Sequence, residues 1–217
     1  PGLKVVIPTT PEDAKGLLLS SIFDPNPVVF IEHRWLHGGR GIVPQGDYRT
    51  PIGKGRVVRA GADITLTSMS YLTVEAMEAA KVLSREYGIE AEVIDLRSVR
   101  PLDWETVLSS VARTGRLLAL DTGFATGSVA GEIVARASME LFDKLKRCLI
   151  PRLRAFEDLH GTYLLTGFIP VVSRESATTG GHLQTSLQAT NTGSLVFGWG
   201  VAKFFGDFII DLIALVF

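Results

Sequence analysis

The stretch from Glu90 to Asp103 (EAEVIDLRSVRPLD) constrains the fold more than any other part of the chain. Its apolar residues predict a strand, which ends in polar residues and Pro101 and gives way at once to an amphipathic helix. These apolar residues are Ala91, Val93, Ile94, Leu96 and Val99. A strand that passes through a short loop into a helix is the unit of an α/β sheet. We therefore predict an α/β fold.

Four charged residues, Asp95, Arg97, Arg100 and Asp103, lie at the carboxyl end of this predicted strand. Ligands and partners of open α/β proteins gather at such strand ends. A simpler interpretation is that these charges only cap the helix and tie the turn. The spacing alone favours this simpler interpretation.

Two predicted strands, residues 3–8 (LKVVIP) and 27–31 (PVVFI), flank a predicted helix near the start of the chain. Thr10 can cap this helix, Pro11 suits its first position, and the two acidic residues that follow complement its dipole. Pro25 stops it. The residues predicted to form its apolar face are Ala14, Leu17, Leu18 and Ile22. Strand, helix and strand together predict the last βαβ piece of a domain whose beginning is absent.

A glycine- and proline-rich stretch, residues 37–53, follows and is typical of a linker over the protein surface. Beyond it, predicted strands alternate with helices, which indicates a mostly parallel sheet covered on both faces. The strands are predicted near residues 56–59, 63–70, 90–97, 116–121 and 148–155, and the helices near 73–87, 103–114 and 128–145. We therefore divide the chain into residues 1–36, a linker at 37–54, a second domain at 55–158 and a tail at 159–217.

The tail differs in composition from the rest of the chain. Residues 173–194 are rich in serine, threonine and glycine, which predicts a flexible linker. Residues 195–217 are strongly apolar, and a helix there would place Lys203, Asp207 and Asp211 on one stripe. Three interpretations stay open. They are a transmembrane helix, against which the three charges count, an amphipathic docking helix, and a sequence foreign to the rest, joined by a frameshift or an assembly error.

Charge and cysteine content exclude some classes of protein. The formal net charge is -1, so nothing indicates a nucleic-acid partner, and a membrane partner is not expected. Cys148 is the only cysteine, which excludes an internal disulfide and fits a reducing cytosol, so we expect a cytoplasmic protein. Cys148 lies in an apolar run and is expected to be a core residue rather than a nucleophile. No signal peptide is visible at the Pro-Gly-Leu start, and we expect a fragment of a longer protein.

Several blocks of the chain, in the same order, resemble the β subunit of the thiamine-diphosphate-dependent 2-oxoacid dehydrogenases. These blocks are PGLKVVIPTTPEDAKGLL, DPNPVVFIEH, TPIGKGRVVRAGADITL, IEAEVIDLRSVRPLD, TGRLLALDTG and GEIVARA. The resemblance covers about residues 1–156 and fades beyond about residue 157. It implies a three-layer α/β/α transketolase C-terminal-like domain with a mostly parallel five-stranded sheet, one strand being antiparallel. The last βαβ piece of a pyrimidine-binding domain would precede it, at residues 1–36.

The resemblance implies oxidative decarboxylation of a 2-oxoacid, with acyl transfer to lipoamide, as the activity of the parent enzyme. In this family the α subunit holds the diphosphate and magnesium. The β subunit's N-terminal domain contacts the aminopyrimidine ring and supplies an activating glutamate and a histidine. Because those positions precede residue 1, we expect no catalytic and no cofactor-binding residue in this chain. Its implied partners in a heterotetramer are the α subunit and a second β subunit, and it would also bind the dihydrolipoyl acyltransferase core.

Two alternatives to this assignment stay open. One is a fragment of a transketolase or a deoxyxylulose-phosphate synthase, which share this C-terminal fold. The block TPIGKGRVVRAGADITL and the Asp-Pro-Asn-Pro turn favour the dehydrogenase over these enzymes. The other alternative is a non-catalytic assembly module with the apolar tail as its docking element.

The segment from Ser20 to Asn26 is the best physical candidate for a cation site. A helix ends here, so its last carbonyls lack intrahelical partners, and Asp24 adds a carboxylate. Such oxygens suit a hard cation of low charge, although a solvated helix end with an Asp-Pro-Asn turn explains the spacing as well. The resemblance implies a structural potassium site here, with part of its ligands upstream of this chain. The matching positions are Ser21, Ile22, Asp24 and Asn26.

The histidines give no sign of a metal centre or of nucleophilic catalysis. His33 and His37 lie four residues apart but lack a third ligand with suitable spacing, so we interpret them as interface or surface residues. His160 and His182 stand alone. No Ser/His/Asp or Cys/His set can be assembled from the sequence.

Two glycine-containing motifs have simple structural interpretations. The run from Gly38 to Gly41 lacks the pattern of a dinucleotide-binding or P-loop phosphate site. Asp121-Thr122-Gly123 and Gly127 follow another predicted strand. They either shape a subunit contact or only form the tight turn from strand to helix.

Overall fold

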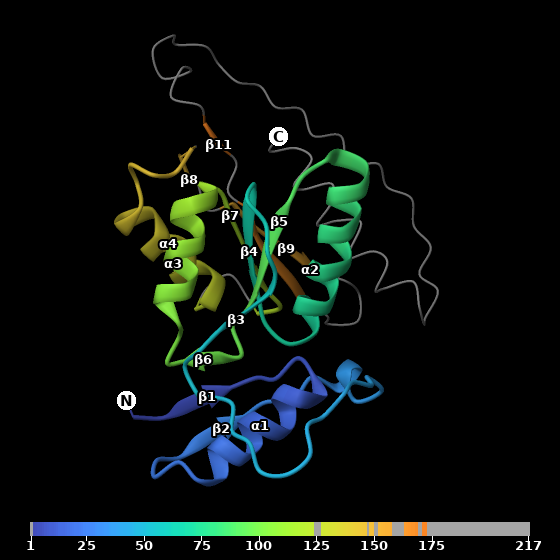
Figure 1. The fold of residues 1–217 in the computed structure, drawn as a ribbon. Coiled ribbons are helices and arrows are strands. Elements are labelled where there is room, and N and C mark those ends of the chain that lie inside the picture. Colours follow the sequence, from blue (N-terminus) through green and yellow to red (C-terminus); the bar gives the residue numbers. More distant parts are fainter. Residues whose placement is uncertain are drawn as a thin grey trace.

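The computed structural model describes residues 2–123 and 127–146, and the backbone of four short strands between residues 148 and 172. A small N-terminal unit lies below a larger three-layer domain in Figure 1. The predicted linker at 173–194, the apolar segment at 195–217, His160 and His182 lie outside the described residues, as does the side chain of Cys148. None of the helices in the described part is long and apolar enough to span a bilayer.

The small N-terminal unit contains a helix and a three-stranded sheet. Strands β1 (Lys4–Val6) and β2 (Val28–Phe30) are parallel, and helix α1 (Pro11–Ile22) connects them. A short 3₁₀ turn, η1 (Arg34–Leu36), follows β2. The third strand, β6 (Ser98–Arg100), comes from the distant stretch between Glu90 and Asp103 and pairs antiparallel with β1.

The prediction of one continuous strand from Ala91 to Val99 is wrong. The strand in the large sheet, β5 (Ala91–Asp95), ends before Arg97, whose φ of 55° turns the chain. The carbonyl of Arg97 then accepts a hydrogen bond from the Ile7 N–H at 2.8 Å. The apolar residues on the two sides of this turn therefore belong to different sheets, which apolar periodicity alone does not distinguish.

The large domain is built on a six-stranded sheet with the order β3-β5-β4-β7-β10-β9. Its remaining strands are β3 (Arg56–Arg59), β4 (Ile64–Ser68), β7 (Leu117–Asp121), β9 (Arg152–Glu157) and β10 (Tyr163–Phe168). Strands β5, β4 and β7 are parallel, whereas β3 and β10 run antiparallel to their neighbours. Strand β10 is one strand more than predicted and falls in the segment expected to be a tail. Strands β8 (Cys148–Leu149) and β11 (Val171–Val172) form a separate pair.

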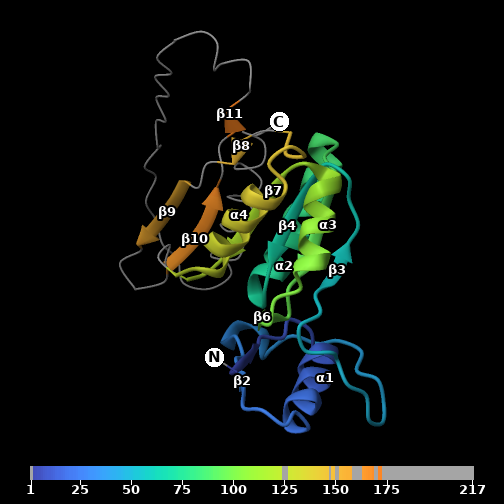
Figure 2. The same ribbon diagram turned by 90° about the vertical axis from the view of Figure 1, so that its left-hand side faces the viewer.

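Helices cover both faces of this sheet, which confirms the three-layer α/β/α prediction. Helix α2 (Tyr71–Val82), extended by a π-helical turn η2 (Leu83–Tyr87), lies on one face. Helices α3 (Trp104–Thr114) and α4 (Val129–Glu140) lie on the other (Figures 1 and 2). Helix α4 is shorter than the predicted 128–145.

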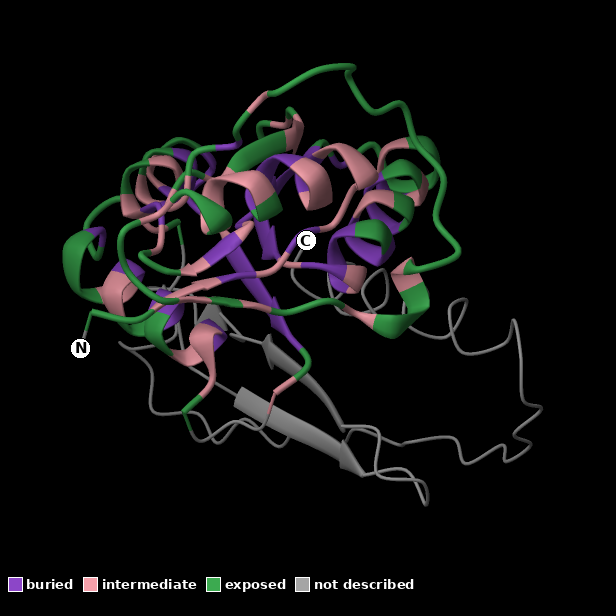
Figure 3. Ribbon diagram, turned by 90° about the horizontal axis from the view of Figure 1, so that it is seen from below, coloured by how far each residue is buried: buried purple, intermediate pink, exposed green. Residues whose placement is uncertain are grey.

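The core consists of two layers of apolar side chains, one on each face of the sheet. Leu66 and Val93 pack against α2, whereas Ile94 and Ala119 pack against α3 and α4. Figure 3 shows the buried residues concentrated in the central strands and on the helix sides that face them. Burying a side chain such as Leu66 contributes about 1.5–3 kcal/mol, so these layers dominate the stability of the domain.

Helix α1 begins as predicted but buries a different face. The Thr10 side chain accepts a hydrogen bond from the Asp13 N–H, and Pro11 occupies the first turn. Of the four residues predicted to form its apolar face, only Leu17 is buried, while Leu18 is 46% and Ile22 64% exposed. The side of the helix that faces inward carries Asp13 and Gly16 instead.

The second half of the predicted linker is fixed along α1. The Tyr48 hydroxyl donates to the Glu12 carbonyl (2.8 Å), the Thr50 N–H donates to the Gly16 carbonyl (3.2 Å), and the Ser20 hydroxyl donates to the Thr50 carbonyl (2.6 Å). We call residues 48–50 the strap. The first half of the stretch is exposed, as a surface linker should be, but the strap is part of the folded unit.

We expect Gly16→Ala to loosen the strap. A Cβ at Gly16 would overlap the Thr50 hydroxyl and lie 2.9 Å from a Tyr48 ring carbon. Overpacking of this kind costs about 1–3 kcal/mol, which exceeds the gain in helix propensity from alanine. Urea unfolding should show the loss. Gly38→Ala is the matched control because a Cβ there has open space, and an equal loss in both variants would contradict the argument.

Candidate functional site

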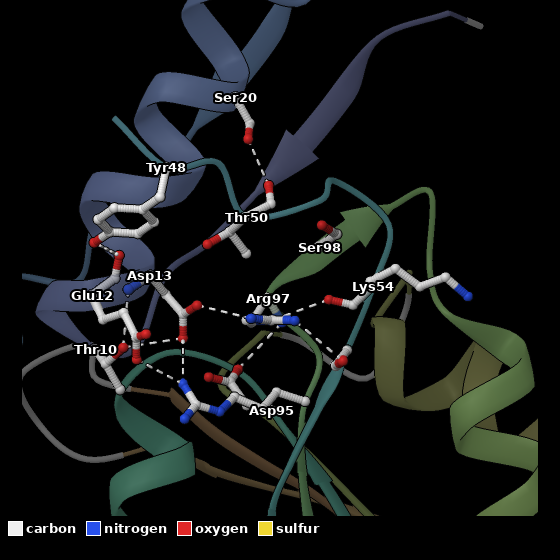
Figure 4. Close-up of polar contacts among 12 residues, drawn as sticks. Thr10, Glu12, Asp13, Ser20, Tyr48, Thr50, Lys54, Asp95, Arg97 and Ser98 are labelled. Atoms are coloured by element: carbon white, nitrogen blue, oxygen red, sulfur yellow. Dashed lines mark hydrogen bonds and ion pairs between the residues drawn. The ribbon is translucent and has the colours of Figure 1, made fainter. Parts of the chain in front are cut away.

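A polar cluster with two buried acids, Asp13 and Asp95, joins the small N-terminal unit to the large domain (Figure 4). We call Thr10, Asp13, Arg56, Asp95 and Arg97 the junction cluster. The N-cap and first turn of α1 supply Thr10 and Asp13, strand β3 supplies Arg56, and the last residue of β5 and the turn after it supply Asp95 and Arg97. The cluster therefore lies at the carboxyl edge of the parallel strands, where α/β folds place their ligands and contacts.

Arg97 links three segments that are far apart in the sequence. Its Nη1 donates to Asp13 Oδ1 at 2.8 Å, its Nε to the Lys54 carbonyl at 3.1 Å and its Nη2 to the Gly55 carbonyl at 3.3 Å. The side chains of Asp13 and Arg97 are 2% and 12% exposed, so the ion pair is shielded from water. Buried charges are tolerated only when they are paired and hydrogen-bonded, and this arrangement meets both requirements.

Asp13 has further partners within the cluster. The Thr10 hydroxyl donates to Asp13 Oδ2 at 3.0 Å, and Arg56 Nη1 lies 3.9 Å from the same oxygen. Arg56 also pairs with Glu12 at 3.0 Å. The prediction that Asp13 complements the helix dipole is therefore incomplete, because its carboxylate also pairs with Arg97 of the large domain.

Asp95 is the least satisfied acid of the cluster. It is fully buried, its Oδ1 accepts the Arg97 N–H at 3.2 Å, and its Oδ2 has no hydrogen-bond partner among the described residues. Burial raises the pKa of Asp95 to about 6. The negative charge of Asp13 adds to the rise, whereas the Thr9 hydroxyl and Arg97 oppose it.

We expect Asp95→Asn to stabilise the protein at neutral pH. A carboxyl whose pKa is raised on folding contributes stability that is present below pH 4 and is lost as the pH rises to about 6. Asparagine does not ionise, so the variant keeps this stability at high pH. Its free energy of unfolding should exceed that of the parent chain by about 3 kcal/mol at pH 7 and should equal it below pH 4. Thermal unfolding of both chains from pH 4 to 8 measures the difference. A difference that is independent of pH would contradict the assignment.

Asp103 and Arg100, the other two charged residues at the end of the Glu90–Asp103 stretch, differ in their contacts. Asp103 caps α3 by accepting the Thr106 N–H at 3.3 Å, and its Oδ2 accepts the Gly55 N–H at 3.0 Å. The capping and tying interpretation is therefore confirmed for Asp103. Arg100 is exposed and forms no ion pair with any residue of the described part.

The second strand end forms a closed turn. Asp121 Oδ1 accepts the Gly123 N–H at 2.9 Å, while Oδ2 accepts hydrogen bonds from the Ser128 hydroxyl (3.1 Å) and the Val129 N–H (2.9 Å). The carboxylate thus satisfies the first turn of α4. These contacts support the interpretation of the segment as a strand-to-helix turn.

The residues predicted to bind potassium lie at the far end of α1 from the junction cluster. Asp24 Oδ2 pairs with the Lys4 ammonium group, and Oδ1 accepts the Asn26 N–H at 2.9 Å. The hydrogen bond from Lys4 lowers the pKa of Asp24. Ile22 is 64% exposed, and the Ser21 hydroxyl donates to the Leu17 carbonyl at 2.7 Å. The oxygens are of the right kind for a hard cation, but Oδ2 of this carboxylate is already paired with Lys4.

The two histidines that were predicted to lie at an interface or at the surface have aromatic or acidic neighbours. His33 stacks on Tyr71 with ring centroids 5.3 Å apart, and both rings contact Trp35. His37 lies 3.9 Å from Glu32. Within residues 2–123 and 127–146, no group of three or more His, Cys, Asp or Glu side chains is arranged to hold a metal ion.

Sequence reasoning missed the junction cluster because its two charged centres, Asp13 and Arg97, lie 84 positions apart. One available signal was the acidic residue at a helix position that periodicity places on the inward side, next to Gly16 and Leu17. No feature of the sequence indicates the positive φ of Arg97.

Comparison with known proteins places the chain in a family. Residues 53–153 match the family model described as the transketolase C-terminal domain. The β subunit of acetoin:2,6-dichlorophenolindophenol oxidoreductase from Cupriavidus necator is 46% identical over 146 residues, which are 67% of this chain and 43% of that protein. The β subunit of the pyruvate dehydrogenase E1 component from Rhizobium meliloti is 47% identical over 146 residues, which are 67% of this chain and 32% of that protein.

A solved structure supports the same placement. A split-gene transketolase, described as an inactive β4 tetramer, superposes with a TM-score of 0.55 and 28% identity, over 64% of this chain and 45% of that one. The chain spans less than half the length of these relatives. Residues 53–153 therefore carry a transketolase C-terminal domain, and over the matched residues the chain belongs to the 2-oxoacid dehydrogenase β subunits, as the C-terminal part of such a subunit.

Proposed function

We propose that the chain is the assembly part of a β subunit whose complete enzyme decarboxylates a 2-oxoacid oxidatively and transfers the acyl group to lipoamide. The observation that carries this proposal is the identity of 46–47% to named β subunits over two thirds of the chain. The junction cluster gives the part a mechanical role, because it fixes the end of the preceding domain on the transketolase C-terminal domain. The described residues offer no convergent acid, base or cofactor loop.

The cofactor chemistry belongs to the rest of the enzyme. Thiamine diphosphate with magnesium would supply the electron sink for the carbanion that decarboxylation leaves, and it would be bound by parts outside this chain. In this proposal the chain contacts an α subunit, a second β subunit in a heterotetramer, and a dihydrolipoyl acyltransferase core. The low cysteine content supports a reducing, cytoplasmic location.

The substrate has two candidates of equal standing. One relative is named for acetoin and another for pyruvate dehydrogenase, at 46% and 47% identity. The identity to the split-gene transketolase is only 28%, which favours the dehydrogenase assignment over a transketolase fragment.

A chimaera tests the proposed function. The chain replaces the corresponding C-terminal part of the Bacillus subtilis pyruvate dehydrogenase β subunit, to which it is 44% identical over 136 residues, and is co-expressed with that enzyme's α subunit. We expect the chimaera to bind the α subunit and to reduce dichlorophenolindophenol with pyruvate or acetoin, whereas the isolated chain shows no turnover. Decarboxylation by the isolated chain, or a folded chimaera that does not bind the α subunit, would refute the proposal.

We also propose that the end of α1 supplies part of a potassium site, through Ser21, Ile22, Asp24 and Asn26. The support is the set of helix-terminal carbonyls beside a carboxylate, which hard cations prefer. Lys4 already places one positive charge on this carboxylate. In the parent chain the Lys4 ammonium group therefore already neutralises the carboxylate that would bind potassium.

Replacing Lys4 should make the protein sensitive to potassium. In Lys4→Met the Asp24 carboxylate loses its cation, and we expect potassium chloride to raise the melting temperature above that in choline chloride at equal ionic strength. The parent chain should show a smaller rise. Asp24→Asn in the Lys4→Met background is the control, and it should abolish the effect. Equal melting temperatures of Lys4→Met in both salts would contradict the potassium proposal.

A further inference from the structure

The outward face of α4 carries an apolar stripe that no contact among the described residues covers. Gly131, Ala135 and Met139 lie four residues apart and therefore share one side of the helix. Ala135 is exposed, and Met139 is 77% exposed. Phe142, just past the end of the helix, is 67% exposed. Large apolar side chains gathered at such exposure mark an interaction surface.

An open pocket of about 650 Å³ lies at the N-terminal end of the same stripe. Its walls are mostly apolar and come from residues 99–102, Trp104 and the first turn of α4, including Gly131. Arg100 and Glu132 also line the pocket, and neither forms an ion pair with another described residue. The pocket thus offers apolar walls with one unpaired charge of each sign.

We propose that α4 packs antiparallel against α4 of a second copy of this chain, so that Met139 of each copy enters the pocket of the other. This inference rests on the proposed function, for which it names the surface that a second β subunit uses. A two-fold contact requires one surface that is complementary to itself. The stripe meets this requirement, because it carries an apolar knob at one end and an apolar pocket at the other.

The spacing along α4 matches this arrangement. Gly131 lies four residues before Ala135 and Met139 lies four residues after it. Each is therefore about 6 Å from Ala135 along the helix axis. If two antiparallel helices cross at Ala135, Met139 of one copy lies level with Gly131 of the other. The small side chains at positions 131 and 135 permit the separation of about 8–10 Å that packed helices need.

The charges beside the stripe are complementary in the same arrangement. Glu132 of one copy comes within about 3 Å, along the axis, of the level of Arg136 of the second copy. Arg136 is held in place, because its Nε donates to Glu140 at 2.6 Å and its guanidinium lies 4.4 Å above the Trp104 ring. Glu132 would therefore gain the cation that it lacks within its own chain. The formal net charge of -1 adds little repulsion between two copies.

Sedimentation of the full 217-residue chain across a dilution series tests the pairing. We expect a reversible dimer, and Met139→Asp should shift it to monomer at every concentration measured. Met139→Gln is the second variant, and it should weaken the dimer without adding a charge. Ile42→Asp is the matched control, because Ile42 is 92% exposed but lies outside α4, and it should leave the dimer intact. A monomeric parent chain, or a dimer unaffected by Met139→Asp, would overturn the proposal.

A cross-link tests the crossing point directly. In a Cys148→Ser background, Ala135→Cys should form a disulfide between two copies under mild oxidation, because the two-fold axis brings this position next to itself. Glu78→Cys on the opposite face of the sheet is the control and should stay monomeric. Absence of the Ala135→Cys cross-link would refute the crossing. A chimaera that still binds the α subunit while this dimer fails would refute only the pairing, whereas loss of α-subunit binding alone would refute the proposed function.

Discussion

Gly61→Ala should prevent the large domain from reaching its native stability. A Cβ at Gly61 would overlap the backbone where strand β5 begins, at the Ala91 carbonyl carbon, the Glu90 carbonyl oxygen and the Glu92 nitrogen. Backbone atoms cannot rotate away as a side chain can. The turn between β3 and β4 would therefore have to separate from β5, where the Ala62 and Asp63 N–H groups both donate to the Glu90 carbonyl.

We expect this substitution to cost about 3 kcal/mol or more, at the upper end of overpacking effects. Chemical unfolding monitored by circular dichroism measures the loss. Gly38→Ala is again the control, because a Cβ there meets nothing within 4 Å. A Gly61→Ala chain as stable as the control would show that the turn is not packed on β5. Since Gly61 lies inside the matched transketolase C-terminal domain, the chimaera should lose α-subunit binding with the same substitution.

The sequence predicts the layers of the large domain well because they rest on local patterns. Strands such as Leu117–Asp121 begin with a continuous apolar run, and Asp103 stands at the start of α3 with the spacing of a capping residue. The structure confirms both. Apolar periodicity does not report where a strand changes sheets, so the break at Arg97 and the transfer of Ser98–Arg100 to the small sheet were not predicted.

The candidate site was predicted only in part, for a physical reason. Asp95, Arg97 and Asp103 stood out because charges at a strand end are conspicuous in sequence. Their partners were not visible, because Asp13 and Lys54 come from other elements and are brought close only by the tertiary fold. The strap was missed for a similar reason. Glycine and proline content predicts irregular backbone but does not report whether that backbone is hydrogen-bonded to α1.

Arg97→Met should detach α1 from the large domain. The substitution removes the guanidinium that pairs with Asp13 and leaves that carboxylate buried, with only Thr10 and the more distant Arg56 as partners. Breaking a buried ion pair by removing one partner costs about 3–5 kcal/mol. Because Thr10 and Arg56 still contact Asp13, we expect a loss of stability near the lower end of this range. We expect hydrogen exchange to accelerate in α1 while the strands β4, β5 and β7 stay protected, because the contact lies at the junction and not in the core.

Arg113→Met is the matched control for this experiment. Arg113 also pairs with a buried acid, Glu92, but both residues lie within the large domain. Its loss should accelerate exchange in the sheet as well as in α3, and not selectively in α1. The double variant Asp13→Asn with Arg97→Met should recover part of the stability, because it no longer buries an uncompensated charge. Equal exchange patterns in the two single variants would mean that the Asp13–Arg97 pair does not hold the junction. The proposed mechanical role of this part of the β subunit would then be wrong.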